Sequence, residues 1–160
     1  MRYSPFMIAG GVIAAPAMAA GTVNITIPQL KNAEYKKPYV VAWVEPAGGG
    51  EARTLSIWYA VNKTGQEPGS KWLSELRSWW RKGGRSLKLP ADGLSGATRA
   101  PGSYSIPLPA DLKPGGYVLN VEAARESGGR EVVSVPITVP ARSASATGKT
   151  ELGAVTLSAK

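Results

Sequence analysis

The chain has 160 residues, enough for one domain with a hydrophobic core, and 19 Lys and Arg against 11 Asp and Glu give a net charge of +8. It contains no histidine and no cysteine, and all three methionines lie within the first 18 residues. The rest of the chain therefore offers no imidazole, thiolate or thioether to ligate a transition metal. It also excludes a His-based catalytic triad, a thiol nucleophile and a disulfide. We expect no metal centre.

The first 19 residues resemble a secretory signal peptide. Arg2 supplies a positive start, an apolar run covers 6–15, and Ala17-Met18-Ala19 forms a small-x-small cleavage site. We therefore expect an exported protein, periplasmic or beyond, with one domain over 20–160. The chain has no later apolar segment of membrane-spanning length. A basic exported protein meets acidic surfaces, acidic partners or phosphate-bearing ligands rather than nucleic acid.

Strand patterns dominate the chain. The candidate segments run apolar or alternate with β-branched and aromatic residues, and Gly- and Pro-rich turns separate them. They predict a mainly β fold, an antiparallel immunoglobulin-like β-sandwich with one short amphipathic helix. Pro136 within a strand pattern indicates an edge or a bulge, and 141–149 reads as a polar linker. The predicted strands are 22–27, 38–45, 53–60, 116–124, 131–139 and 151–159.

One helix is predicted near 71–82, with Ser70 as N-cap and Gly83 just after its end. Its apolar residues form a stripe about 120° wide. This stripe either packs on the sandwich or leaves an indole free to line a cleft for a flat ligand. The stripe consists of Trp72, Leu73, Leu76, Trp79 and Trp80.

The same region is strongly basic. It is either a solvated helix face or a surface for an anionic partner. Its positive residues, opposed only by Glu75, are Lys71, Arg77, Arg81, Lys82, Arg85 and Lys88.

The stretch DGLSGAT, residues 92–98, begins with an Asp-Gly turn and ends in a threonine flanked by small residues. With no histidine in the chain, Thr98 has no activating base of the usual kind and is a poor catalytic nucleophile. It suits the role of an acceptor that another enzyme modifies.

DGLSGAT resembles the acceptor motif of FAD:protein FMN transferases of the ApbE type. The resemblance implies that Thr98 carries FMN through a phosphoester bond and that Asp92, Ser95, Gly96 and Ala97 are recognised by the transferase. Arg99 is the adjacent cation for the phosphate, with Arg85 and Lys88 upstream. We expect the flavin ring to lie against an aromatic wall drawn from Trp72, Trp79, Trp80 or Tyr104.

A broader resemblance covers most of the chain after the signal peptide. The segments PYVVAWVE, TLSIWYA, KWLSELRSWWRKGGR and VEAARESGGRE are similar to a bacterial family of predicted periplasmic proteins of unknown function. Members of that family often stand beside PepSY-type membrane reductases and iron-uptake genes. This resemblance implies a membrane reductase as electron donor and a link to iron or haem reduction.

The sequence therefore predicts an exported electron carrier with covalent FMN rather than an enzyme with its own substrate. An alternative is a periplasmic binding module that captures haem, a siderophore or a glycan with exposed aromatic residues. Haem capture would depend on tyrosine as the ligand. A third possibility is a structural or adhesive sandwich without a ligand.

Overall fold

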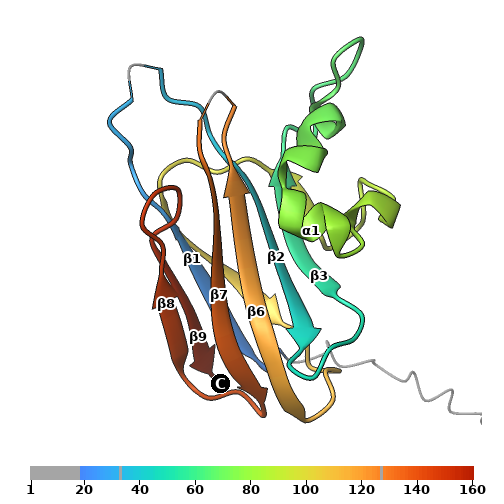
Figure 1. Cartoon of the computed structure of the whole chain (residues 1–160), viewed down its shortest axis with the longest axis vertical. Helices are drawn as coiled ribbons and strands as arrows, with labels where there is room; N and C mark the ends of the chain where they lie inside the picture. The colour runs from blue at the N-terminus through green and yellow to red at the C-terminus, as the bar shows by residue number, and fades with distance from the viewer. Residues whose placement is uncertain (1–18, 33, 127) are drawn as a thin grey trace, which may run out of the picture.

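The computed structural model describes residues 19–32, 34–126 and 128–160, so the predicted signal peptide lies almost wholly outside the described residues. Two β-sheets pack face to face, and a short helical segment covers part of one of them (Figure 1). The expected mainly β sandwich with one short amphipathic helix is confirmed. The strands are β1 (Gly21–Ile27), β2 (Tyr39–Pro46), β3 (Arg53–Tyr59), β4 (Ser95–Ala97), β5 (Gly102–Leu108), β6 (Gly115–Ala124), β7 (Arg130–Val139), β8 (Ala144–Thr147) and β9 (Ala154–Ala159).

The smaller sheet has the strand order β5-β1-β9-β8 and the larger one β4-β3-β2-β6-β7. Every pairing is antiparallel except that of β4, which runs parallel to β3. Pro136 lies in β7 at the edge of the larger sheet, as predicted, where it is exposed. An edge strand tolerates proline because one row of its backbone groups makes no ladder bonds.

The main core lies between the sheets and follows from strand alternation. In β1, Val23, Ile25 and Ile27 point inward and are at most 1% exposed, whereas the residues between them face outward. β6 contributes Leu119 and Val121 from the opposite sheet in the same way. Burial of such alternating apolar residues is the main favourable term in sandwich stability.

A second core lies on the outer face of the larger sheet. There Val41, Trp43 and Ile57 pack against buried Leu73 and Trp79 of the helical segment. The single helix expected over 71–82 is wrong in detail, because the segment divides into three short pieces. They are η1 (Gly69–Glu75, 3₁₀), α1 (Arg77–Arg81) and η2 (Gly84–Ser86, 3₁₀).

The division of the helix has a local cause. Leu76 leaves helical geometry at φ −77° and ψ 69° and is fully buried. The carboxylate of Glu122, also fully buried, then accepts hydrogen bonds from the backbone N–H groups of Ser78 and Trp79 at 3.1 and 2.9 Å. Glu122 thus binds the free amides at the start of α1 and fastens the segment to β6.

Of the two predicted helix ends, the N-terminal one is wrong and the C-terminal one is confirmed. Pro68, not Ser70, precedes η1, and no side chain caps it. Gly83 follows the C-cap of α1 with a positive φ of 119°, as predicted for that position.

Three strands were not predicted. Part of the supposed linker 141–149 forms β8, which pairs with β9 through half-buried Ala144 and Ala146. β5 pairs with β1, and β4 forms within DGLSGAT. These strands carry small residues or proline, so their hydrophobic pattern is weak.

Candidate functional site

The start of DGLSGAT is a turn, as expected. Gly93 has a φ of +75°, which glycine adopts without strain. The Ser95 hydroxyl accepts a hydrogen bond from the backbone N–H of Ala91 at 3.0 Å and so closes the turn. The carbonyl of Leu94 accepts from the N–H of Ile57 at 2.8 Å. Ser95 therefore has a structural task, and the turn is tied to β3.

The end of the motif is a strand rather than a loop. Residues Ser95–Ala97 pair with Ile57–Tyr59 of β3 as the parallel edge strand β4. Gly96 lies against the Trp58 indole, where an added Cβ would stand 3.3 Å from Cδ1. Any larger residue at position 96 would push on the Trp58 ring, so packing favours glycine there, where the motif also has it. Thr98 follows β4 directly and is half-buried.

Thr98 lines a cavity of about 640 Å³ at the end of the sandwich drawn uppermost in Figure 1. Its walls come from the segment before β2, the exit of β3, η1 and the β6–β7 hairpin. Four basic side chains line it against two acidic ones, Glu75 and Glu126. The basic residues are Lys36, Lys37, Lys63 and Arg125, and the aromatic ones are Tyr35, Tyr39 and Trp72.

Tyr39 and Trp72, two of the aromatic residues that line the cavity, differ in their contacts and exposure. The Tyr39 hydroxyl donates to the carbonyl of Gly69 at 2.8 Å, which ties η1 to the start of β2. Burial raises the pKa of that phenol. Trp72 is 39% exposed and is the one large hydrophobic side chain among the described residues that is left open to solvent. The Tyr39 ring is therefore held in place, whereas Trp72 is partly open to solvent, with the Lys71 ammonium 5.1 Å from its ring centre.

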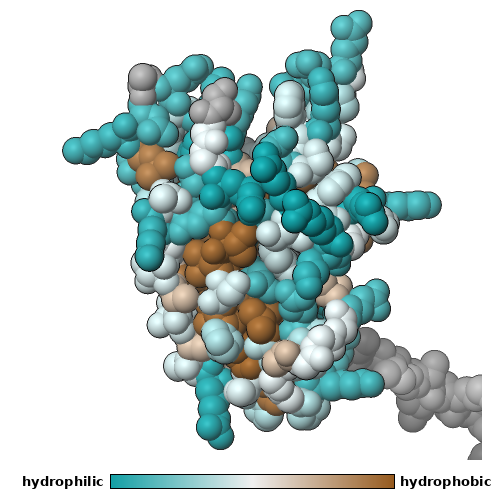
Figure 2. All heavy atoms as spheres, viewed as in Figure 1, coloured by the Kyte–Doolittle hydropathy of each residue, from teal (hydrophilic) through white to brown (hydrophobic). Residues whose placement is uncertain are grey.

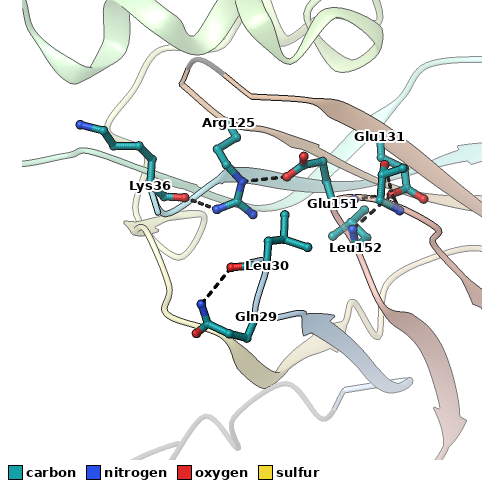
Figure 3. A network of polar contacts seen from close by, with 8 residues as sticks. Gln29, Leu30, Lys36, Arg125, Glu131, Glu151 and Leu152 are labelled. Atoms are coloured by element: carbon teal, nitrogen blue, oxygen red, sulfur yellow. Dashed lines mark hydrogen bonds and ion pairs between the residues drawn. The ribbon is translucent and has the colours of Figure 1, made fainter. Parts of the chain in front are cut away.

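Arg125 is the most buried cation of the cavity. Its side chain is 2% exposed, and its Nε donates to Glu151 Oε2 at 2.8 Å (Figure 3). Its Nη1 donates to the backbone carbonyl of Lys36, and the guanidinium carbon lies 4.7 Å from the centre of the Tyr35 ring. A buried ion pair of this kind fixes the position of the guanidinium.

The loop that carries Glu151, the partner of Arg125, is held in place by Glu131 on β7. Backbone N–H groups of Lys149, Thr150 and Glu151 donate to the Glu131 carboxylate, as does the Thr150 hydroxyl. Figure 3 shows Glu131 beside Glu151 and Leu152. Burial alone would raise the pKa of Glu131, but these hydrogen bonds outweigh it and lower the pKa to about 2. The loop that presents Glu151 is therefore clamped at neutral pH.

Arg99 lies on the other side of β4, in a separate hollow of about 280 Å³. Its guanidinium stacks over Trp58 and Tyr104, at 5.2 and 5.6 Å from the ring centres. The Tyr104 hydroxyl donates to the carbonyl of Ala100 at 2.6 Å. Arg99 and Tyr104 thus hold the segment after β4 against the sheet and do not line the Thr98 cavity.

Other residues predicted for the site are dispersed. Asp92 and Ala97 are exposed, as are Arg85 and Lys88, which do not line the Thr98 cavity. Of the indoles proposed as flavin walls, only Trp72 lines it. Trp79 is 1% exposed, with its Nε1 donating to the Thr54 hydroxyl at 2.8 Å, and Trp80 is half-buried beside it.

The cavity residues Lys36, Lys63 and Arg125 were not predicted from the sequence, and Tyr35 was considered only as one of the tyrosines available to ligate haem. No spacing rule connects them to Thr98, because the fold brings them together from three separate connections. One available signal was Arg125 itself, a cation directly after a long apolar strand, where buried charge calls for an explanation.

Within 19–32, 34–126 and 128–160, no cluster of three or more acidic residues, histidines or cysteines is placed to hold a metal ion. The helices of that part of the chain are all too short or too polar to cross a membrane.

Comparison with protein families places the fold in context. The model of the family DUF2271, described as predicted periplasmic protein, matches residues 20–154. The chain belongs to this family. The match spans the DGLSGAT motif and every residue named above for the Thr98 cavity, and the periplasmic location expected for the chain is that of the DUF2271 family. No curated protein and no solved structure showed significant similarity to this DUF2271 chain.

Proposed function

We propose that the protein is an exported flavoprotein that carries FMN on Thr98 and transfers electrons outside the cytoplasm. A membrane-bound PepSY-type reductase is the electron donor in this proposal, and the acceptor belongs to iron or haem reduction. The observation that supports it best is the position of the Thr98 side chain. The motif threonine follows an edge strand and lines a basic cavity with aromatic walls.

The cavity suits FMN in size and chemistry. A volume near 640 Å³ falls within the range of cofactor sites. Lys37 and Lys63 offer ammonium groups for the phosphate, while Lys36 is paired with Glu34 at 3.1 Å. Trp72 is 39% exposed and offers an indole for the ring on the face away from the Lys71 ammonium, which lies 5.1 Å from the ring centre. Bound flavin supplies one- and two-electron transfer, and the protein provides position and charge.

Attachment requires Thr98 to react with FAD in the active site of a transferase. The Thr98 hydroxyl oxygen attacks the flavin-side phosphorus, the pyrophosphate P–O bond breaks, and AMP leaves. A base of the transferase takes the hydroxyl proton. The exposed side chains of Asp92 and Ala97 on the same segment are accessible for recognition, while Ser95 and Gly96 hold the strand in its shape.

The test is co-export of the protein with an FAD:protein FMN transferase, followed by denaturing electrophoresis and intact-mass measurement. The wild type should fluoresce on the gel and gain the mass of one FMN less water. Thr98→Ala should lose the label completely, and Thr98→Ser should keep part of it because a hydroxyl remains. Thr147→Ala, which removes an exposed hydroxyl from β8, is the matched control and should be labelled fully.

A second candidate, capture of a free anionic ligand such as haem or a siderophore, draws on the basic lining of the cavity and on exposed Trp72. The same experiment separates the two. A wild type that stays unlabelled but binds haem or a ferric siderophore with quenching of tryptophan fluorescence would favour the binding module.

A further inference from the structure

The helical segment on the outer face of the larger sheet is strongly basic over its second half. Between Glu75 and Asp92 the chain carries five basic residues and no acidic one. All five are exposed, and none of them lines the cavity of Thr98 or the hollow of Arg99. The five are Arg77, Arg81, Lys82, Arg85 and Lys88. The site described above therefore makes no use of this charge.

The fold uses only part of the charge. Lys82 pairs with Glu45 at 3.1 Å. Arg77 pairs with Glu75 at 3.6 Å, and both of those side chains are more than half exposed. The other three basic residues make no ion pair with any residue of 19–32, 34–126 or 128–160, and an exposed cation without a partner attracts anions. These three are Arg81, Arg85 and Lys88.

The apolar side of the segment is already covered. Leu73, Leu76 and Trp79 are buried in the second core, against the larger sheet. Figure 1 shows the segment on the outside of that sheet, and in Figure 2 mostly hydrophilic residues cover it. An amphipathic helix that lies within a membrane interface needs a free apolar face. This segment offers charge instead, with the partly exposed Trp72 as the exception.

We propose that Arg81, Arg85 and Lys88 hold the exported protein against an anionic phospholipid surface. Lipid headgroups form a continuous layer of negative charge, and each Lys or Arg near such a layer strengthens binding about fivefold. Long side chains without fixed partners suit moving headgroups, whereas recognition of an acidic protein depends on a fixed arrangement of charge pairs. The proposal does not depend on flavin attachment, and it brings the proposed carrier to the membrane that contains its donor.

The test is co-sedimentation of the exported protein with vesicles, first at low ionic strength and then with added salt. Vesicles of equal parts phosphatidylglycerol and phosphatidylcholine should bind the wild type, and vesicles of phosphatidylcholine alone should not. Arg81→Gln, Arg85→Gln and Lys88→Gln combined should weaken binding to the anionic vesicles about 100-fold, from about fivefold for each charge. Salt should release the bound protein, because charges are screened beyond about 8 Å at physiological ionic strength.

The control variant removes the same charge from other surfaces. It combines Lys31→Gln, Lys113→Gln and Arg142→Gln, three exposed residues that also make no ion pair among the described residues. It should lose no more than about fivefold in binding, and both variants should melt like the wild type because exposed side chains are replaced. A loss as large as that of the first variant would overturn the proposal, since net charge alone would explain it. So would a wild type that does not bind anionic vesicles, and binding to polyglutamate instead would favour an acidic protein partner.

Discussion

Two hollows flank β4, the strand that directly precedes Thr98, and an arginine lines each of them. Arg99 is exposed and stacks on Trp58 and Tyr104, so its guanidinium serves to hold the chain against the sheet. Arg125 is buried, is fixed by Glu151 and by the Lys36 carbonyl, and belongs to the lining of the Thr98 cavity. Arg99 is the arginine next to Thr98 in the sequence, but it is Arg125 that the fold brings to the cavity lined by Thr98.

The distribution of hydrophilic and apolar residues on the surface also differs between the cavity end and the face of the sheet. In the view of Figure 2, hydrophilic residues cover most of the helical segment and of the loops at the cavity end, apart from one apolar patch at the upper left. Apolar residues reach the surface mainly over the middle of the face that carries β6 and β7. A charged ligand is therefore better matched to the cavity end than to the open face of the sheet.

The largest expected effect is a difference in unfolding free energy between the variants Arg125→Gln and Arg99→Gln. Arg125→Gln leaves Glu151 buried without its partner and should cost about 3–5 kcal/mol of unfolding free energy. Arg99→Gln removes cation–π contacts at an exposed site and should cost about 1 kcal/mol. Urea denaturation of both variants measures the difference. Equal losses would mean that the two guanidinium groups are not held differently.

A smaller effect tests the clamp behind Arg125. Since the pKa of Glu131 is lowered to about 2 in the fold from an ordinary value of 4.5, its contribution to stability is full above about pH 5 and disappears as the pH falls toward 2. Glu131→Gln should therefore be less stable than the wild type by about 2 kcal/mol at pH 7, after allowance for partial exposure. Thermal unfolding from pH 7 to pH 2 should show the two curves converge. A gap that does not change with pH would refute the clamp.

The smallest effect on stability concerns Trp72. Trp72→Ala removes a side chain that is 39% exposed and should cost about 1 kcal/mol of unfolding free energy. In the labelled protein it should raise flavin fluorescence, because a stacked indole quenches the ring. Trp79→Ala is the contrasting variant, since loss of that buried ring should cost about 3–5 kcal/mol. Fluorescence unchanged by Trp72→Ala would place the ring elsewhere.

The sandwich was predictable because its strands have strong patterns. Val23, Ile25 and Ile27 alternate with polar residues, and Pro136 correctly marked an edge strand. The three strands that were not predicted, β4, β5 and β8, are short or contain small residues and proline. They form because each can pair with the edge of a neighbouring strand. β8 has Ser-Ala repeats that bury little surface, and a local pattern cannot distinguish it from a linker.

The helical segment shows how tertiary contacts override periodicity. The stripe from Trp72 to Trp80 fits one amphipathic helix, but Glu122 on β6 binds the amides of Ser78 and Trp79 and fixes the start of α1 there. Leu76 leaves the helix to reach the core. The carboxylate comes from a distant strand, so no reading of the segment alone reveals the break.

The candidate site was predictable only in its local part. Residues 92–98 identified Thr98 and the turn before it, because those features are encoded in seven consecutive residues. The cavity depends on Tyr35, Lys36 and Arg125, which meet through strand pairing and the Arg125–Glu151 pair. Such long-range contacts leave no local pattern.

Attachment of FMN to Thr98 is tested most directly by fragmentation mass spectrometry of the tryptic peptide 89–99 from the co-exported wild type. This peptide contains two side-chain hydroxyls, those of Ser95 and Thr98. We predict one FMN phosphoester, located on Thr98 alone, because the Ser95 hydroxyl closes the turn with Ala91 while Thr98 lines the cavity. FMN on Ser95, or an unmodified peptide from protein co-exported with an active transferase, would contradict it.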